Sequence, residues 1–231
     1  MNSSKEYYDK LAAHYQDISR KRLNFLDAID QYVIDRAGNV SNYLDIGAGD
    51  GSRSMNIANA ISPEHITLIE PSPEIASGII PNDKLEVIIS DISDFRSGMK
   101  YELITCLWNV LGHVGDLEER RIFFQCCKEL LAPNGRLILD VNNRYNVSVY
   151  GNKDVMENLT NDLEQKPGAG YFDLGDSESV TQVYIHAPLE IENLALDVGL
   201  HVSELRYIDY ETGKFRDTFF EGQLFYVIEH E

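Results

Sequence analysis

A glycine-dense turn stands between a short apolar segment and a candidate helix. Residues 42–54 read NYLDIGAGDGSRS, with glycines at Gly47, Gly49 and Gly51. Glycine lacks a Cβ atom, so it tolerates unusual backbone torsions and lets another group approach the main chain closely. Strand–turn–helix units of this kind direct the unpaired N–H groups of a helix N-terminus at a nucleotide ligand. The segment therefore predicts a ligand-binding loop.

The spacing of the glycines selects between ligands. A dinucleotide fingerprint requires G-x-G-x-x-G, and Ser52 occupies its last required position. Asp50 stands where a diphosphate would pass, and its carboxylate would repel that group. A ligand with an ammonium group and no phosphate suits acidic residues at this place. The turn, together with Asp45 at the end of the apolar segment, favours S-adenosylmethionine over NAD or FAD.

A further acidic residue follows the second apolar segment. Residues 65–69 read HITLI and are followed by Glu70 and Pro71. An acid at the tip of the second strand, about twenty residues after the glycines, is placed to accept hydrogen bonds from ribose hydroxyls. A solvated loop carboxylate is the alternative for Glu70. Its combination with the glycine turn favours the ribose role.

The composition limits the partners. The chain of 231 residues has 38 acidic and 20 basic residues, a formal net charge of −18. Nucleic-acid binding needs basic surfaces, so we expect a small-molecule acceptor and no nucleic-acid partner. The sequence shows neither a membrane span nor the layout of a signal peptide, which predicts a cytoplasmic location. Its three cysteines lack the spacing of a zinc site or a disulfide framework, and we expect no metal.

Strand-like and helix-like segments alternate after residue 40. The expected strands are residues 43–46, 65–70, 85–89, 103–108 and 136–141, and the expected helices are residues 52–61, 73–77 and 117–131. This alternation predicts a doubly wound α/β domain with a mostly parallel sheet.

The C-terminal third has a different pattern. A helix is expected at residues 189–198, followed by strands at residues 201–210 and 215–229. The turn signal at residues 211–213, which read ETG, predicts a hairpin between these strands. At least one of the two strands must then run antiparallel to the sheet.

Two segments lie outside the expected sheet. Residues 1–40 show helical spacing of apolar side chains and predict an N-terminal helical cap. Residues 142–186 form a long connection that begins at the carboxyl edge of the fifth strand, where open α/β sheets bind ligands. We interpret this connection as a substrate lid within a single domain of residues 1–231. A decorative insertion without substrate contact is the alternative.

Five segments in order resemble class I S-adenosylmethionine-dependent methyltransferases: LDIGAGDGS, IEPSPE, SDISDF, CLWNVLGHV and LLAPNGRLILDV. The resemblance extends from about Tyr43 to the C-terminus. It implies a Rossmann-like seven-stranded sheet with a C-terminal antiparallel hairpin, S-adenosylmethionine as cofactor and S-adenosylhomocysteine as product. The cofactor-binding residues that it implies are Asp45, Gly47, Gly49, Asp50, Gly51, Glu70, Pro71, Asp91, Ile92 and Asn109.

A narrower similarity connects the chain with glycine N-methyltransferases. The segment WNVLGHVGD is similar to their GNSFAHLPD-type segment, which implies roles for Asn109 and His113. Tyr15 and Arg22 are similar to the tyrosine and arginine that cover the cofactor in that group. The arginine that binds the substrate carboxylate there falls on Asn142 in this chain.

Most candidates for binding the methyl acceptor lie in the two segments outside the expected sheet. Arg144 is the arginine available near Asn142, the position at which the similar group has its carboxylate-binding arginine. His186 lies near the end of the expected lid. Aromatic side chains there either surround a cation or seal the lid against water. The substrate-binding candidates are Tyr8, His113, Arg144, Tyr150 and His186.

Methyl transfer from a sulfonium mainly requires alignment of the nucleophile and exclusion of water. A base helps when the nucleophile is a hydroxyl or a protonated amine, and His113 is the catalytic candidate because histidine titrates near neutral pH. A structural histidine is the alternative for this position. We predict in-line transfer to an oxygen or nitrogen of a small molecule, by a monomer or homodimer. A peptide or protein N-methyltransferase and a non-catalytic cofactor-binding module remain the alternative functions.

Overall fold

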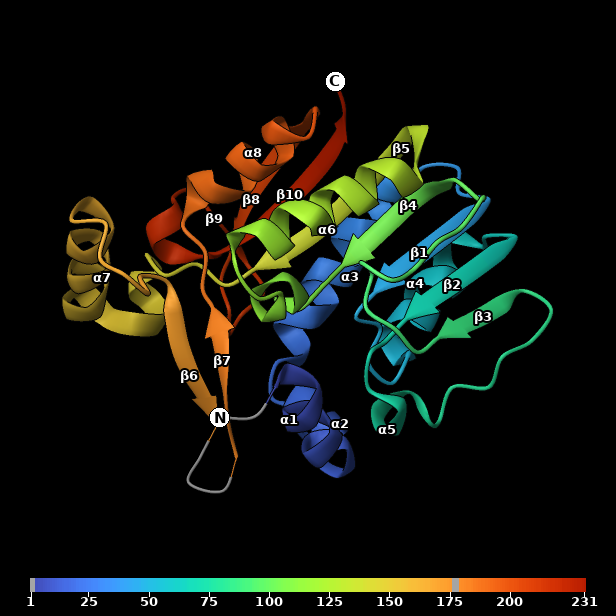
Figure 1. The fold of residues 1–231 in the computed structure, drawn as a ribbon, viewed down its shortest axis with the longest axis horizontal. Helices are drawn as coiled ribbons and strands as arrows, with labels where there is room; N and C mark the ends of the chain where they lie inside the picture. The colour runs from blue at the N-terminus through green and yellow to red at the C-terminus, as the bar shows by residue number, and fades with distance from the viewer. Residues whose placement is uncertain (1–2, 176–178) are drawn as a thin grey trace.

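In the described part of the chain, eight strands form a central sheet with helices on both faces (Figure 1). The computed structural model describes residues 3–175 and 179–231. The strand order across the sheet is β3-β2-β1-β4-β5-β10-β8-β9. The bounds are β1 (Asn42–Ile46), β2 (His65–Ile69), β3 (Leu85–Ile88), β4 (Tyr101–Cys106), β5 (Leu131–Val141), β8 (Leu200–Ile208), β9 (Phe215–Arg216) and β10 (Gln223–His230).

The first five strands pair in parallel, and β10 lies antiparallel between β5 and β8. This arrangement confirms the predicted Rossmann-like, mostly parallel sheet with an antiparallel C-terminal hairpin. The sheet has eight strands instead of seven because the short β9 pairs with β8 at the edge. A separate antiparallel pair consists of β6 (Tyr171–Gly175) and β7 (Val180–Tyr184).

The second strand of the predicted hairpin, residues 215–229, is not continuous. It divides into β9, the short helix η3 (Phe219–Glu221) and β10. Burial explains the division, because β9 is exposed whereas residues 223–228 of β10 are buried. The chain leaves the sheet edge after β9 and inserts its apolar segment between β5 and β8, where both faces are covered.

Helices cover the two faces of the sheet. Phe25 and Ile29 of α3 pack with Ile57 of α4 on one face, and Phe123 of α6 packs with Leu194 of α8 in the core of the other. This is the doubly wound layout that the alternation predicted. The bounds are α1 (Ser4–Leu11), η1 (Ala12–His14), α2 (Tyr15–Arg20), α3 (Leu23–Ala37), α4 (Ser52–Ile61), α5 (Pro73–Ala76), η2 (Val110–His113), α6 (Leu117–Leu130), α7 (Val147–Leu163) and α8 (Pro188–Asp197). None of the helices in residues 3–175 and 179–231 is long and apolar enough to cross a membrane.

The two segments outside the predicted sheet lie next to each other. The N-terminal segment is helical as predicted, and α1 contacts both α5 and β7. The connection after β5 has its own structure, which comprises α7 and the β6–β7 pair (Figure 1). Helix α7 is kinked at Gly151, whose φ of 78° is not helical. Both segments therefore flank the carboxyl edge of the parallel strands.

A buried ionic network ties the connection to helix α8. The Arg144 guanidinium lies 2.8 Å from a carboxylate oxygen of Asp162 on α7 and 2.6 Å from one of Glu190 on α8. The Tyr184 hydroxyl on β7 donates to Glu190 at 2.8 Å. Because the Arg144 side chain is only 5% exposed, its charge depends on these two carboxylates for compensation.

We predict that Arg144→Ala lowers the free energy of unfolding by about 3–5 kcal/mol, because Asp162 and Glu190 lose a buried cation. Urea unfolding followed by circular dichroism measures the effect. Arg121→Ala is the matched control, since its side chain is 41% exposed, and its loss should stay below about 1 kcal/mol. Equal losses in both variants would contradict a structural role for the Arg144 network.

Candidate active site

The glycine turn forms a loop pinned to β2. The backbone N–H groups of Gly47 and Ala48 both donate to the Ile69 carbonyl, at 2.8 and 3.0 Å. Gly47, Gly49 and Gly51 have φ values of 73°, 59° and 74°, which L side chains rarely adopt. Helix α4 begins directly afterwards. A Cβ atom at Gly47 would lie 2.5 Å from the Val110 side chain, so the position has room only for glycine.

Two buried acids support this loop. The Glu70 carboxylate accepts hydrogen bonds from the N–H groups of Gly49 and Ser72, each at 2.9 Å. Burial raises the pKa of Glu70 against these two bonds. Asp45 accepts hydrogen bonds from the hydroxyls of Ser54 and Thr105, and burial raises its pKa to about 6. Glu70 thus holds the loop directly, whereas Asp45 connects β1 with the first turn of α4 and with β4.

A cavity of about 320 Å³ opens beside the loop. The N-terminal helices cover it, and the Tyr15 hydroxyl lies 2.6 Å from where a Cβ atom of Gly49 would be. The Tyr15 ring contacts the Trp108 ring at a centroid distance of 5.8 Å. The lining includes Tyr15, Arg20, Asp30, Asp45, Gly47, Asp50, Arg53, Leu107 and Trp108. The structure thus brings Tyr15 together with the predicted loop residues.

Helix α1 contacts His113, the predicted catalytic residue. The Tyr8 hydroxyl lies 2.9 Å from His113 Nε2, and Ser4 Oγ lies 3.2 Å from His113 Nδ1. Burial lowers the pKa of His113 to about 4, so the imidazole is neutral at pH 7 and does not have the near-neutral pKa on which its prediction as the catalytic residue rests. The structure therefore unites two of the predicted substrate residues, Tyr8 and His113, although 105 positions separate them in the sequence.

Other predicted residues lie in different surroundings. Asn109 is buried, and its side-chain oxygen accepts a hydrogen bond from the Asn142 N–H at 2.8 Å. The Arg22 guanidinium lies 4.3 Å above the Tyr210 ring and does not line the cavity. Asp91 is exposed, whereas Ile92 belongs to the apolar core.

The remaining substrate candidates belong to the segment after β5. Arg144 and His186 both contact Glu190, and His186 Nδ1 lies 3.5 Å from its carboxylate. Tyr150 is half-buried, and burial raises its pKa to about 12. The contacts of Arg144 are internal ones, so a substrate role for it stays a prediction. Pro71 is half-buried directly after Glu70.

Three residues near the site were not singled out from the sequence. Trp108 follows β4 and lines the cavity, as does Arg53 on α4, which pairs with Asp30 at 2.5 Å. Asp140 is buried at the end of β5, and its carboxylate accepts a hydrogen bond from the Trp108 N–H. For Trp108 and Asp140 the available signal was position, because both lie at the carboxyl end of a predicted strand, whereas Arg53 lies within a predicted helix.

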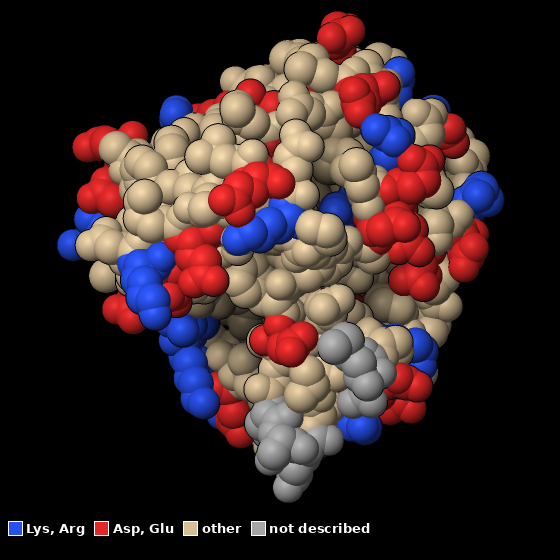
Figure 2. Space-filling view, turned by 60° about the vertical axis from the view of Figure 1, so that its left-hand side comes forward, with Lys and Arg blue, Asp and Glu red and all other residues tan. Residues whose placement is uncertain are grey.

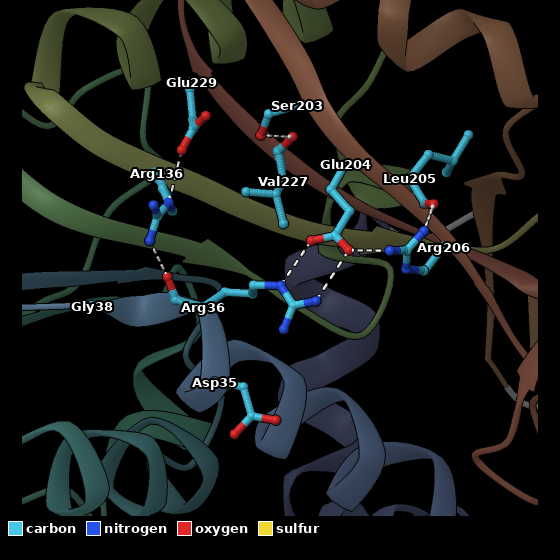
Figure 3. A pocket seen from close by; sticks show the side chains of 10 residues that line it. All are labelled: Asp35, Arg36, Gly38, Arg136, Ser203, Glu204, Leu205, Arg206, Val227 and Glu229. Atoms are coloured by element: carbon cyan, nitrogen blue, oxygen red, sulfur yellow. Dashed lines mark hydrogen bonds and ion pairs between the residues drawn. The ribbon is translucent and has the colours of Figure 1, made fainter.

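A larger hollow of about 580 Å³ lies between the end of α3 and strands β8 and β10 (Figure 3). Arg36 pairs there with Glu204, and Arg136 pairs with Glu229, both at 2.8 Å. It shares no lining residue with the glycine-loop cavity. Because these charged groups already compensate each other and none belongs to the loop, the smaller cavity is the candidate active site.

Comparison with known proteins identifies a methyltransferase domain. Residues 44–137 match the family model Methyltransf_12, described as a methyltransferase domain. The sheet that contains these residues is mostly parallel, and its C-terminal strand β10 is antiparallel to its neighbours. Residues 44–137 therefore form a methyltransferase domain. Solved structures with this fold are described with S-adenosylmethionine or S-adenosylhomocysteine bound, which supports S-adenosylmethionine as the cofactor. No curated protein matches the chain.

Solved structures of other methyltransferases share its fold. An S-adenosylmethionine-dependent methyltransferase from Clostridium acetobutylicum ATCC 824 has 18% identity and a TM-score of 0.64, covering 96% of this chain and 98% of its own. CalS10, an amino pentose methyltransferase from Micromonospora echinaspora with S-adenosylmethionine bound, has 16% identity and a TM-score of 0.63, covering 93% and 96%. CcbJ from Streptomyces caelestis has 16% identity and a TM-score of 0.67, covering 89% and 96%. At these identities the likeness is one of fold.

We predict that Gly49→Val weakens S-adenosylhomocysteine binding by roughly a hundredfold or more. The new side chain would collide with the Tyr15 hydroxyl and would strain a backbone with a φ of 59°. Titration calorimetry measures the affinity. Gly78→Ala is the control, because a Cβ atom there meets nothing within 4 Å. Unchanged affinity of Gly49→Val would refute this placement of the ligand.

The affinity for S-adenosylhomocysteine should rise with pH through about 6, the pKa to which burial raises Asp45. Because the folded protein favours the neutral Asp45 carboxyl, this preference contributes its full folding stability below pH 3.8, the ordinary pKa of the group. The contribution is lost as the pH rises through about 6. A ligand ammonium favours the ionised carboxylate and so binds better above that pH. Calorimetry at several pH values should show this rise in the parent and a flatter profile in Asp45→Asn. Identical profiles would exclude Asp45 as its source.

Proposed function

We propose that this methyltransferase transfers the methyl group of S-adenosylmethionine to an oxygen or nitrogen of a small-molecule acceptor. The observation that carries the proposal is that the N-terminal helices contact two neighbouring features. Tyr15 lines the cavity beside the glycine loop, and Tyr8 contacts His113. A donor site and a polar group suited to an acceptor thus lie under one segment. Bound S-adenosylmethionine supplies an electrophilic methyl group on a positively charged sulfur.

The donor side is assigned to the loop and its acids. Asp45 and Asp50 line the cavity and would attract the ammonium of the methionine end. Glu70 would hold the ribose, because its carboxylate stands behind Gly49 at the end of β2. Asp91 and Ile92 follow β3 and are proposed to contact the adenine. The cavity carries more carboxylates than cations, which suits a donor with net positive charge at its reacting end.

The acceptor side is assigned to His113 and Tyr8. A neutral imidazole has a lone pair on one ring nitrogen and can take a proton from a hydroxyl or an ammonium. Ser4 and Tyr8 now contact its two nitrogens, so an acceptor would replace one of these contacts. His113 then receives the proton that the acceptor loses, and the remaining contact fixes the orientation of the ring.

The enclosure of the site supports a small acceptor over a peptide. Helix α1 bridges α5 and β7 across the carboxyl edge, where a peptide would need an open groove. The similar fold of CalS10, described as an amino pentose methyltransferase, adds support for a small molecule. Acidic and basic side chains are interspersed on the face in Figure 2, and the net charge is −18. Neither feature suits a nucleic acid.

Methyl transfer to small amines and alcohols tests the function, with S-adenosylhomocysteine release as the measured product. For an accepted substrate, His113→Ala should lower kcat by about a hundredfold while the affinity for S-adenosylhomocysteine stays near that of the parent. His65→Ala, an exposed histidine at the start of β2, should behave like the parent. Turnover of His113→Ala within a few-fold of the parent would exclude the base role. Absence of saturable binding of either S-adenosyl compound to the parent would refute the proposed function itself.

A further inference from the structure

The turn after β4 has an unusual backbone. Trp108 and Asn109 are consecutive, neither is glycine, and their φ values are 63° and 59°. The left-handed region is unfavourable for a bulky aromatic residue, so such a conformation persists only where neighbouring groups enforce it. Trp108 lines the cavity assigned to the donor and contacts Tyr15. The conformation of this turn therefore sets one wall of that cavity.

The end of β5 supplies the enforcing groups. Asp140 Oδ1 accepts a hydrogen bond from the Trp108 N–H at 2.5 Å. The Asn109 side chain accepts one from the N–H of Asn142, two residues farther along the chain. Asp140 is only 1% exposed, and its Oδ2 atom has no hydrogen-bond partner among the described residues. A carboxylate is thus held out of water with the strained turn as its direct partner.

The charged surroundings of Asp140 come from three neighbouring elements. Arg53 on α4 attracts the carboxylate, whereas Asp30 on α3 opposes its charge and itself pairs with Arg53. The thiol of Cys106 on β4 is a further titratable group that interacts with it. Burial raises the pKa of Asp140 to about 6, while Arg53 and the backbone N–H groups of Trp108 and Asn109 favour the ionised form. The turn and the carboxylate therefore stabilise each other.

We propose that Asp140 is a positioning residue: its carboxylate holds the left-handed Trp108–Asn109 turn and, through it, the wall of the methyl-donor cavity. The assignment of the cavity to the donor rests on the proposed function. The effect of Asp140 on the turn does not, because it follows from contacts within the protein alone.

Trp108 reports on this turn directly, because the chain contains one tryptophan. Asp140→Ala should shift the Trp108 fluorescence emission and weaken S-adenosylhomocysteine binding by roughly tenfold. Asp140→Asn keeps an acceptor oxygen of the same shape and should retain binding within about threefold of the parent at pH 7. Parent-like emission and affinity in Asp140→Ala would overturn the proposal.

Tyr101→Phe is the matched control for loss of stability. Its hydroxyl contacts the Thr67 hydroxyl at 3.1 Å and is buried at the opposite end of β4. This variant should lose some stability and keep the parent's emission and affinity. A weakening of binding equal to that of Asp140→Ala would mean that affinity merely follows stability, and would overturn the proposal.

A pH titration keeps the proposal testable if Asp140→Ala does not fold. Parent Trp108 emission should change near pH 6 as Asp140 ionises, and Asp140→Asn should lack this transition. A transition that persists in Asp140→Asn belongs to another group, such as Asp45, and would contradict the proposal. If the parent binds no S-adenosylhomocysteine, the proposed function fails while these emission measurements still decide the role of Asp140.

Discussion

The active site depends on how β2 holds the loop that follows β1. One carbonyl, that of Ile69, accepts the N–H groups of both Gly47 and Ala48, and the Glu70 carboxylate accepts that of Gly49. Three consecutive N–H groups are therefore fixed by the neighbouring strand. This geometry forces φ values that glycine adopts without steric cost. The loop is shaped by the protein itself, so a ligand that enters the cavity meets a preorganised surface.

Buried carboxylates give this preorganised site its electrostatic character. Burial raises the pKa of Asp45 and of Asp140 to about 6, and it also raises that of Glu70. Hydrogen bonds from hydroxyl and N–H groups offset part of the cost of burying the ionised Asp45 and Asp140 carboxylates, and the charge of Arg53 offsets a further part. Some repulsion among the acids remains, as Asp45 raises the pKa of Glu70. A cationic ligand would relieve it, which gives a physical reason for such a site to prefer a sulfonium donor over an anionic nucleotide.

The elements that the sequence predicted well are those with local signals at both ends. Helix α4 occupies the predicted residues 52–61 because Gly51 and Ser62, on either side, adopt left-handed backbone conformations. The prediction failed at residues 215–229, where local strand propensity extends through β9 and η3. Only the space between β5 and β8 determines which part becomes the inserted strand.

The site followed the same division between local and tertiary signals. Asp45 and Glu70 were readable because each lies at the carboxyl end of a predicted strand. The left-handed turn at Trp108 was not, because its cause is the Asp140 carboxylate on the neighbouring strand. The contact of Tyr8 with His113 joins residues 105 positions apart, and no local pattern encodes a pair at that separation. Likewise, the partners of Arg144 come from α7 and α8, so its ionic network could not be read from the sequence around it.

The N-terminal segment links the two halves of the site. Tyr15 lies over Gly49 on the proposed donor side, whereas Tyr8 contacts His113 on the proposed acceptor side, and the Ser72 hydroxyl donates to Asp9, which lies between Tyr8 and Tyr15 in the sequence. Three contacts from one short helical segment therefore cover both sides at once. A movement of the whole segment away from the loop would also break the contact with His113. Methyl transfer requires that water be excluded from the cavity and from His113. The N-terminal segment contacts both places, so one segment is sufficient to shield the two together.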